Sequence, residues 1–348
     1  MAGGNWDPTA LPIAPGIYIN FVQRAAAAIN GGERGTVALG LTTYTGGTAV
    51  AKTIYTVERE IEAIDLFGVA NIDPIRLAFA GGAAKVAVYT LPASPVTADY
   101  ADMRNAFDSF DFNVFAFDKA DAIEQSSFKT WVIQSREDGK HFMLVIGGSS
   151  TDDATPATGN ARSILNADDY IVNETIGGVY GTTVLSSAQS TVHTAGSIAG
   201  ARINESVTYA ATAFSNVNKR LSNSERDAAL EDGSLILMHD GKRVKIVQGI
   251  TTSKKKIRAI RARQAVATDI TEAATESYIG KLQNNADGQA TLIAAIMRYM
   301  ETLEANSVLA DPVVELDPLY PSVDDKVFLR VSYREIDSME RIFFTINV

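Results

Sequence analysis

The last ten residues of the chain, 339–348, constrain its fold more than any other stretch, because they have the pattern of an amphipathic β-strand. Side chains of a strand alternate between its two faces. One face here is fully apolar and holds Ile342, Phe344, Ile346 and Val348. The other face is mixed and includes Phe343. Chain ends are usually polar and frayed unless something holds them, so this strand must either complete its own subunit's core or pair with a neighbour.

A matching strand is expected near the N-terminus. It contains the β-branched and aromatic residues Ile17, Tyr18, Ile19, Phe21 and Val22. Three prolines within residues 1–15 keep the preceding stretch extended and out of helices. We therefore predict extended β arms at both ends of the chain, residues 1–24 and 336–348, with strands that contact adjacent subunits.

Composition excludes several classes of function. A net charge of −10 over 348 residues argues against general affinity for nucleic acid or for an anionic membrane. The chain has no cysteine, which rules out disulfides, thiolate metal sites and a cysteine nucleophile. Its N-terminus has neither the basic nor the apolar region of a signal peptide, and its apolar runs are too short to span a bilayer. We expect neither nucleic-acid binding nor membrane insertion.

The sequence between the arms alternates strand and helix patterns. Apolar strands are expected at residues 36–44, 84–91, 112–117 and 140–146, and amphipathic helices at 57–67, 73–80, 100–110 and 121–136. Strands that are apolar on both sides and alternate with helices indicate a parallel sheet covered by helices. A small-residue helix at 185–201, a helix at 224–232 capped by Ser224 and a hairpin around Asp240-Gly241 follow.

The C-terminal part has a different pattern. Helices are expected at 270–282 and 289–306, a proline-containing loop at 311–322, and a strand at 326–334. The fold class is thus α/β and α+β multidomain, with extended β arms at both termini. We predict a small inserted α/β or β-rich domain at 25–95, a central α/β sheet domain at 96–250 and a C-terminal α+β domain at 251–335, with the first boundary at Pro92 and Pro95.

No motif for catalysis, cofactor binding or metal binding stands out. Gly147-Gly148 follows a predicted strand, but the phosphate-loop lysine and the dinucleotide-binding glycine pattern are missing, so a plain turn at the sheet edge is favoured. The chain has three histidines, His141, His193 and His239, but no serine in a G-x-S-x-G nucleophile motif and no obvious acidic partner for a catalytic triad. Acidic pairs in loops lack calcium-loop spacing. An α/β enzyme of unknown substrate is kept as an alternative from a different class.

A basic run leads into the C-terminal part. It consists of Lys254, Lys255, Lys256, Arg258, Arg261 and Arg263. In an acidic protein, such a run is more consistent with a contact to an acidic surface of another copy of the protein than with nucleic-acid binding. The remaining alternative is that these side chains are simply solvated.

Several short stretches, in a fixed order, carry a family resemblance. They are residues 15–18, 196–201, 206–209, 225–237, 247–252, 278–281 with Asn284, and 337–342. Together they resemble contractile phage tail sheath proteins, in the shorter form found in phages and phage-derived elements of Gram-positive bacteria. They cover most of the chain from about residue 100 onward and the N-terminal arm.

The resemblance implies a structural subunit without catalytic activity or a cofactor. Its arms would add strands to sheets of adjacent subunits, giving a helical tube around an inner tail tube. The sheath would contract on a signal from the baseplate and drive the inner tube through the host envelope. The implied partners are other copies of the chain, the inner tube protein, and baseplate and tail terminator proteins. The basic run would face the tube or another subunit, and the particle, assembled in the host cytoplasm, would be a phage tail or a phage-tail-like bacteriocin.

Overall fold

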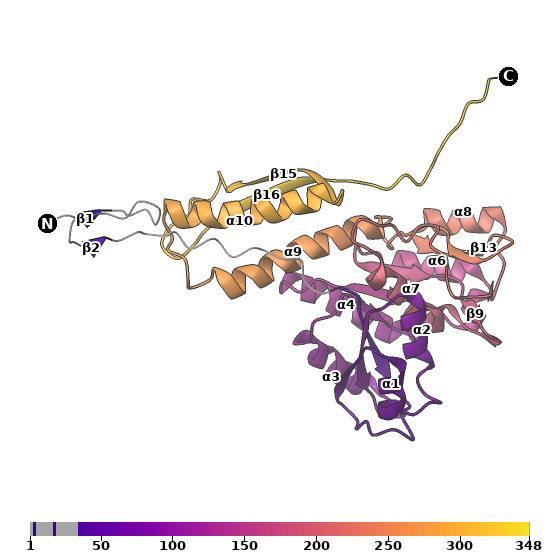
Figure 1. Ribbon diagram of the computed structural model, residues 1–348. Coiled ribbons are helices and arrows are strands. Elements are labelled where there is room, and N and C mark those ends of the chain that lie inside the picture. Colours follow the sequence, from indigo (N-terminus) through magenta and orange to yellow (C-terminus); the bar gives the residue numbers. More distant parts are fainter. Residues whose placement is uncertain (1–2, 5–16, 19–33, 348) are drawn as a thin grey trace.

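The computed structural model of the protein describes residues 3–4, 17–18 and 34–347. An α/β body occupies the lower and right part of the molecule (Figure 1). Two long helices, α9 (Ile257–Ser277) and α10 (Ala286–Ala305), extend away from it to the left, with strands β15 and β16 lying along α10. The last segment leaves in the opposite direction and ends far from the body. No helix of the described ranges is long and apolar enough to cross a bilayer.

A seven-stranded sheet forms the centre of the body, with strand order β12-β8-β7-β6-β3-β5-β4. Its strands are β3 (Thr36–Leu41), β4 (Ile54–Val57), β5 (Lys85–Thr90), β6 (Val114–Ala116), β7 (Met143–Ile146), β8 (Ile171–Glu174) and β12 (Ser234–Leu235). All pair in parallel except the edge strand β4, which is antiparallel to β5. The predicted parallel sheet is therefore confirmed.

This sheet crosses the boundary that the sequence predicts near residue 95. Strand β3 lies in the middle of the sheet, between β5 and β6. Its residues Val37, Ala38 and Leu39 are buried, as expected for a strand covered on both faces. The strands within residues 25–95 thus belong to the central sheet and form no separate domain, which differs from the prediction. A proline-rich stretch such as 92–95 can be a simple strand-to-helix connection.

Helices cover the sheet. They are α1 (Glu60–Phe67), α2 (Asp73–Gly81), α3 (Thr97–Asp108), α4 (Ala122–Glu137), α5 (Ser150–Asp153), α6 (Pro156–Leu165), α7 (Ser187–Gly200) and α8 (Asn223–Glu231). The core between α3, α4 and the sheet is aromatic, with Phe107, Phe115 and Phe128 fully buried and in ring contact. Helix α8 is capped by Ser222 paired with Glu225 instead of Ser224, because this pair forms the reciprocal capping box.

Small residues in helix α7 allow it to pack closely against helix α2. A Cβ on Gly196 would lie 2.2 Å from the carbonyl oxygen of Ala78, and one on Gly200 would lie 2.0 Å from that of Gly82. Helices α2 and α7 therefore approach each other at backbone contact distance, which only glycine permits. The sequence predicts close packing of this helix against the sheet, and the structure adds the close contact with α2.

Smaller strand pairs surround the body. Strands β9 (Gly178–Tyr180), β10 (Thr183–Val184) and β11 (Asn216–Val217) form one sheet, and the predicted hairpin is confirmed as β13 (Leu237–His239) with β14 (Val244–Ile246). Near the N-terminus, β1 (Gly3–Gly4) pairs in parallel with β2 (Ile17–Tyr18).

The C-terminal region departs from the sequence prediction at two points. Helix α9 starts at Ile257, well before the expected start at residue 270, so the three arginines of the basic run are helical and its three lysines precede the helix. Strand β15 (Leu309–Leu316) occupies the predicted loop and pairs in antiparallel fashion with β16 (Leu329–Glu335). Pro312 lies where the register shifts between Ala310 and Val313. Such an irregularity allows a strand to contain a residue without an N–H group.

Candidate assembly surfaces

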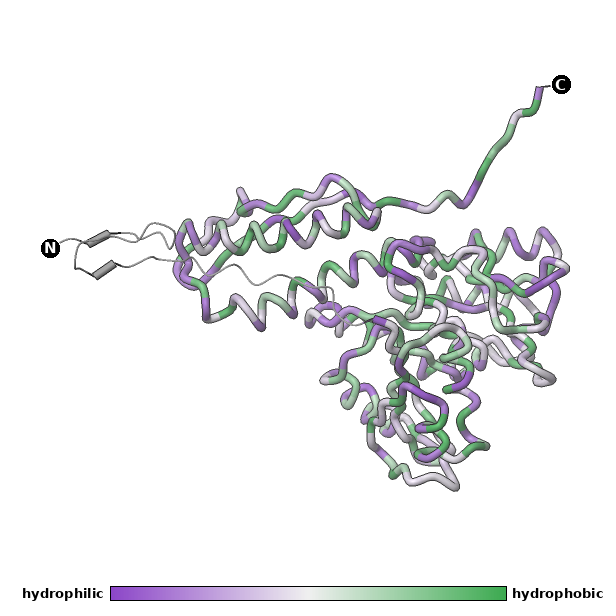
Figure 2. The backbone as a smooth tube through the Cα atoms, viewed as in Figure 1, coloured by the Kyte–Doolittle hydropathy of each residue, from purple (hydrophilic) through white to green (hydrophobic). Residues whose placement is uncertain are grey.

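The C-terminal arm, residues 336–347, contains no helix and no strand. It extends away from the rest of the molecule and carries a succession of apolar residues (Figures 1 and 2). Phe343 is 90%, Phe344 82% and Ile346 81% exposed. The sequence leaves open that this strand completes its own subunit's core, for which residues 342–348 would pair with 326–334, but among the described residues β16 pairs only with β15. No part of the chain that the structure describes covers these exposed apolar side chains.

The β15–β16 sheet is a second incomplete surface. One of its faces packs on α10, where Leu309 and Val314 join a small core with Met300 and Leu303. Within the described ranges its outer edges pair with no further strand. A two-stranded sheet is marginally stable, and an open edge presents unpaired N–H and C=O groups that another strand can complete.

The predicted N-terminal strand is described only in part. Ile17 and Tyr18 form β2, which pairs with Gly3 and Gly4 of the same chain. Ile19, Phe21 and Val22 lie outside the described residues, as does Val348 at the other end. The predicted pairing of this arm with a neighbouring subunit stays a prediction.

The basic run does not form one surface. Lys254 and Lys255 are exposed. Arg261 is buried and donates to the carbonyl oxygens of Ala201 and Arg202, and burial lowers the pKa of its guanidinium to about 10. The three remaining cations contact the end of β16 and the residues after it. The run therefore divides into two exposed lysines and four residues that hold the structure together.

These three cations bind the end of β16 and the first part of the C-terminal arm, from Glu335 to Glu340. Arg263 forms an ion pair with Glu335 at 2.5 Å, and Arg258 donates to the carbonyl oxygen of Ile336 at 2.7 Å. Lys256 forms an ion pair with Glu340. The arm is free only beyond Glu340. The sequence offers a weak signal for this arrangement, an acidic residue placed just before an apolar alternating stretch.

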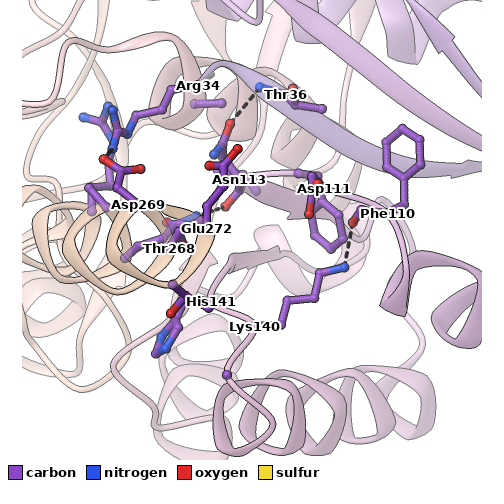
Figure 3. Close-up of a pocket in the computed structure, with 18 of the residues that line it drawn as sticks. Arg34, Thr36, Phe110, Asp111, Asn113, Lys140, His141, Thr268, Asp269 and Glu272 are labelled. Atoms are coloured by element: carbon purple, nitrogen blue, oxygen red, sulfur yellow. Dashed lines mark hydrogen bonds and ion pairs between the residues drawn. The ribbon is translucent and has the colours of Figure 1, made fainter. Parts of the chain in front are cut away.

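A cavity of about 930 Å³ lies between the sheet and α9 (Figure 3). Its wall includes Thr36 and Val114, which start β3 and β6, and Lys140, which precedes β7. The cavity is thus at the amino ends of the parallel strands. Ligands of open α/β sheets bind at the carboxyl ends, so its position does not favour an enzyme active site.

The polar groups of this cavity are largely occupied by structural contacts. Lys140 donates to the carbonyl oxygen of Phe110 at 2.6 Å, and the Asn113 side-chain oxygen accepts from the backbone N–H of Thr36 at 3.0 Å. Arg34 forms an ion pair with Asp269 of α9 at 2.5 Å. The last of these contacts connects the chain just before β3 to α9, and the groups that form the three contacts are not available to a ligand.

The opposite edge, where Gly147-Gly148 follows β7, is closed by α7. The Gly148 N–H donates to the Ser187 hydroxyl at 2.7 Å, and a Cβ on Gly147 would lie 2.4 Å from the backbone nitrogen of Ala188. These glycines permit close packing with the start of α7, consistent with the plain turn favoured from sequence.

The histidines do not form a catalytic group. His193 is buried, its Nε2 accepts from the Ala213 N–H, and burial lowers its pKa to about 4. His141 contacts Tyr170, and burial lowers the pKa of its imidazole as well. His239 accepts from Gly241 in the hairpin turn. The described ranges contain no group of three or more histidine, aspartate or glutamate side chains that could hold a metal ion.

Comparisons with known proteins identify similar proteins over most of the chain. The phage tail sheath central-domain model matches residues 93–252, and the phage tail sheath C-terminal-domain model matches residues 251–348. The chain is 23% identical over 227 residues to the tail sheath protein of Clostridium phage phiCD119, an alignment that covers 62% of this chain and 60% of that protein.

Solved structures extend the similarity to the fold. The sheath tail protein of Desulfitobacterium hafniense matches with a TM-score of 0.73 and 18% identity, over 92% of this chain and all of that one. The helical sheath of the anti-feeding prophage in its contracted state matches with a TM-score of 0.75 and 16% identity, over 97% and 99% of the two chains. The two family models together span residues 93–348, and the chain belongs to the phage tail sheath proteins.

Proposed function

We propose that this protein is the structural subunit of a contractile sheath and polymerises by strand exchange into a helical tube around an inner tube. The observation that carries the proposal is that one chain has both an uncovered apolar arm and a sheet with unpaired edges. Among residues 34–347, nothing covers Phe343, Phe344 and Ile346 of the arm, and no further strand pairs with the edges of the β15–β16 sheet. An arm that adds a strand to another copy's sheet would complete both.

Geometry favours an open array over a closed dimer. The arm and the tip of the β15–β16 sheet point to opposite ends of the molecule (Figure 1). A contact between two different surfaces is heterologous, and repeated heterologous contacts build a ring or a helix. Each added main-chain hydrogen bond contributes only about 1 kcal/mol net, but a tube repeats the contact at every subunit.

Such an array can contract without losing its connections. The central body is a packed unit around one sheet, whereas the arm is a single extended segment. Rigid bodies joined by extended arms can rotate against each other while the arms stay paired, as in hinge-type transitions. Contraction on a baseplate signal would then drive the inner tube through a host envelope. We assign no catalytic role to the protein.

The same subunit fits a phage tail and a phage-tail-like bacteriocin or other injection particle. The similar proteins include both a phage protein and the anti-feeding prophage sheath. We favour the virion tail, assembled in the bacterial host cytoplasm with inner tube, baseplate and terminator proteins. Capsid genes beside the coding gene would support this choice, and their absence would favour the bacteriocin.

Electron microscopy of the purified chain with its tube protein tests the proposal. The full chain should form tubes, and a chain that lacks residues 342–348 should remain folded and fail to assemble. Equal circular dichroism spectra and melting temperatures of the two proteins provide the control. A truncated chain that unfolds, or one that still forms tubes, would contradict strand exchange through this arm.

The exposed lysines test the contact with the tube. Reversing the charge of Lys254 and Lys255 together should impair assembly on the tube and leave the fold intact, because neither side chain is buried. Reversal of Lys242 and Arg243 in the exposed β13–β14 turn is the matched control. Normal assembly of the first variant would show that these lysines do not face the tube.

A further inference from the structure

The anchor of the C-terminal arm is a buried carboxylate. The Glu340 side chain is 8% exposed, although Met339 before it is 91% and Phe343 after it 90% exposed. One acidic side chain in this exposed segment thus turns inward and is covered by the body. Burial of a carboxylate is costly unless charged and hydrogen-bonding partners surround it.

Glu340 has such partners, and they come from three separate parts of the body. It forms an ion pair with Lys256 at the start of α9. It accepts from the Thr208 hydroxyl at 2.7 Å and from the Ser206 hydroxyl at 3.1 Å. It also accepts from the Gln248 amide at 3.3 Å. Lone pairs of both carboxylate oxygens are used, as a buried ion pair requires.

The partners are themselves fixed. The backbone N–H of Gly249 donates to the Thr208 hydroxyl at 2.9 Å, and the Thr208 N–H donates to the Ser206 hydroxyl at 3.1 Å. Burial by itself raises the pKa of Glu340, but the bonds to Lys256, Thr208 and Gln248 outweigh it and lower that pKa. The carboxylate therefore stays charged at neutral pH. The site is preorganised to receive one carboxylate at one position.

We infer that Glu340 is a positioning residue, which fixes the point and direction from which the C-terminal arm leaves the body toward its neighbour. The inference rests on the proposed strand exchange. With the anchor closed, the eight residues after Glu340 span roughly 28 Å when extended. With the anchor open, the twelve residues after Ile336, whose carbonyl oxygen still accepts from Arg258, span roughly 42 Å.

A shorter, directed tether favours assembly. The local concentration of an arm near its receiving strand falls as the tether lengthens, and ordering the extra residues costs conformational entropy. The anchor removes this cost before the neighbour arrives. It also transmits a pull on the arm to α9 and the body, so that the β15–β16 pairing does not carry it alone.

Spin labels measure the anchor directly in the dilute monomer. The chain has no cysteine, so Ala228→Cys in α8 and Arg341→Cys beyond the anchor give two unique labels at exposed positions. The intact protein should give a narrow distance distribution between the labels in double electron–electron resonance. Glu340→Gln should broaden it at least about twofold, because the tether lengthens. Exposed Glu231→Gln in α8 is the matched control and should change nothing.

Assembly gives the second readout. Glu340→Gln should raise the protein concentration needed for tube formation about tenfold, and the exchange of Lys256→Glu with Glu340→Lys should restore part of the loss. If Glu340→Gln impairs folding, Lys256→Met removes the same ion pair from its more exposed side. An unchanged distance distribution, or broadening without any change in assembly, overturns the inference. If the intact protein forms no tubes, the proposed function fails, and the distance measurement still decides whether the anchor exists.

Discussion

The central sheet and the C-terminal arm use the same apolar residue types in opposite environments. Phe115 and Phe128 are fully buried between helix and sheet, whereas Phe343 and Phe344 are 90% and 82% exposed. Apolar area buried from water contributes about 25 cal/mol per Å² to stability, so the body gains its stability within one chain. The arm is covered by no described part of its own chain, and in the proposed strand exchange it gains this stability from a second chain. The difference divides the molecule into a body whose apolar residues are buried and an arm whose apolar residues are exposed, and we propose that a second subunit covers the arm.

Matched phenylalanine substitutions test this division with the largest expected effect. Phe128→Ala should lower the free energy of unfolding by about 3–5 kcal/mol, because it leaves a cavity in a fully buried aromatic cluster. Phe344→Ala should change the monomer by less than about 0.5 kcal/mol and weaken tube formation instead. Urea unfolding and electron microscopy provide the two measurements. A clear loss of monomer stability in Phe344→Ala would show that the arm contributes to the subunit's own fold and would contradict this division.

Acid should destabilise the body, with an effect of about 3 kcal/mol. Burial lowers the pKa of His193 to about 4, from an ordinary value of 6.5. The unfolded chain therefore takes up a proton first, and the free energy of unfolding should fall as the pH drops from about 6.5 to about 4, and level off below. His193→Gln keeps an acceptor for the Ala213 N–H and should reduce this dependence.

The control for this prediction is His239→Gln, because His239 is only half-buried at the end of β13, beside the exposed hairpin turn. His141 adds a smaller contribution of the same sign, since burial lowers its pKa too. Urea unfolding at a series of pH values measures the effect. An unaltered pH dependence in His193→Gln would show that another group controls acid stability.

Gly196→Ala should give the smallest loss in the body, about 1–3 kcal/mol. The new methyl group would lie 2.2 Å from the carbonyl oxygen of Ala78, so α2 and α7 must move apart. Ser197→Ala on the same helix is the control, because Ser197 is only partly buried and its hydroxyl bonds to the His193 carbonyl within the helix. Thermal unfolding of both variants measures the difference. Equal melting temperatures would mean that the two helices do not need to approach so closely.

The sequence predicts the body better than the C-terminal region, for a physical reason. Strands β3, β5 and β7 are buried on both faces, and such strands have a clear apolar pattern. Strand β15 contains Pro312, and Asp311 has a positive φ of 53°, so local rules predict a loop there. Packing on α10 and pairing with β16 override that preference.

The assembly features divide in the same way. The alternation at 339–348 indicates an amphipathic strand, whereas residues 336–347 form no strand in this structure and Phe343, Phe344 and Ile346 are exposed. The role of the basic run was not predictable, because Arg258 and Arg261 are held by backbone carbonyl groups that are distant in sequence. The membership of β3 in the central sheet depends on pairing with β6, and a contact of this kind leaves no local pattern.

Cross-linking between two single-cysteine proteins tests the central claim most directly. One protein carries Phe344→Cys in the arm and the other Ser332→Cys in β16, where both side chains are exposed. Because the parent chain has no cysteine, a mixed disulfide can form only between the two introduced residues of different chains. Tubes assembled from the mixture should yield the mixed dimer on mild oxidation. Tubes that yield no mixed dimer would contradict strand exchange between subunits.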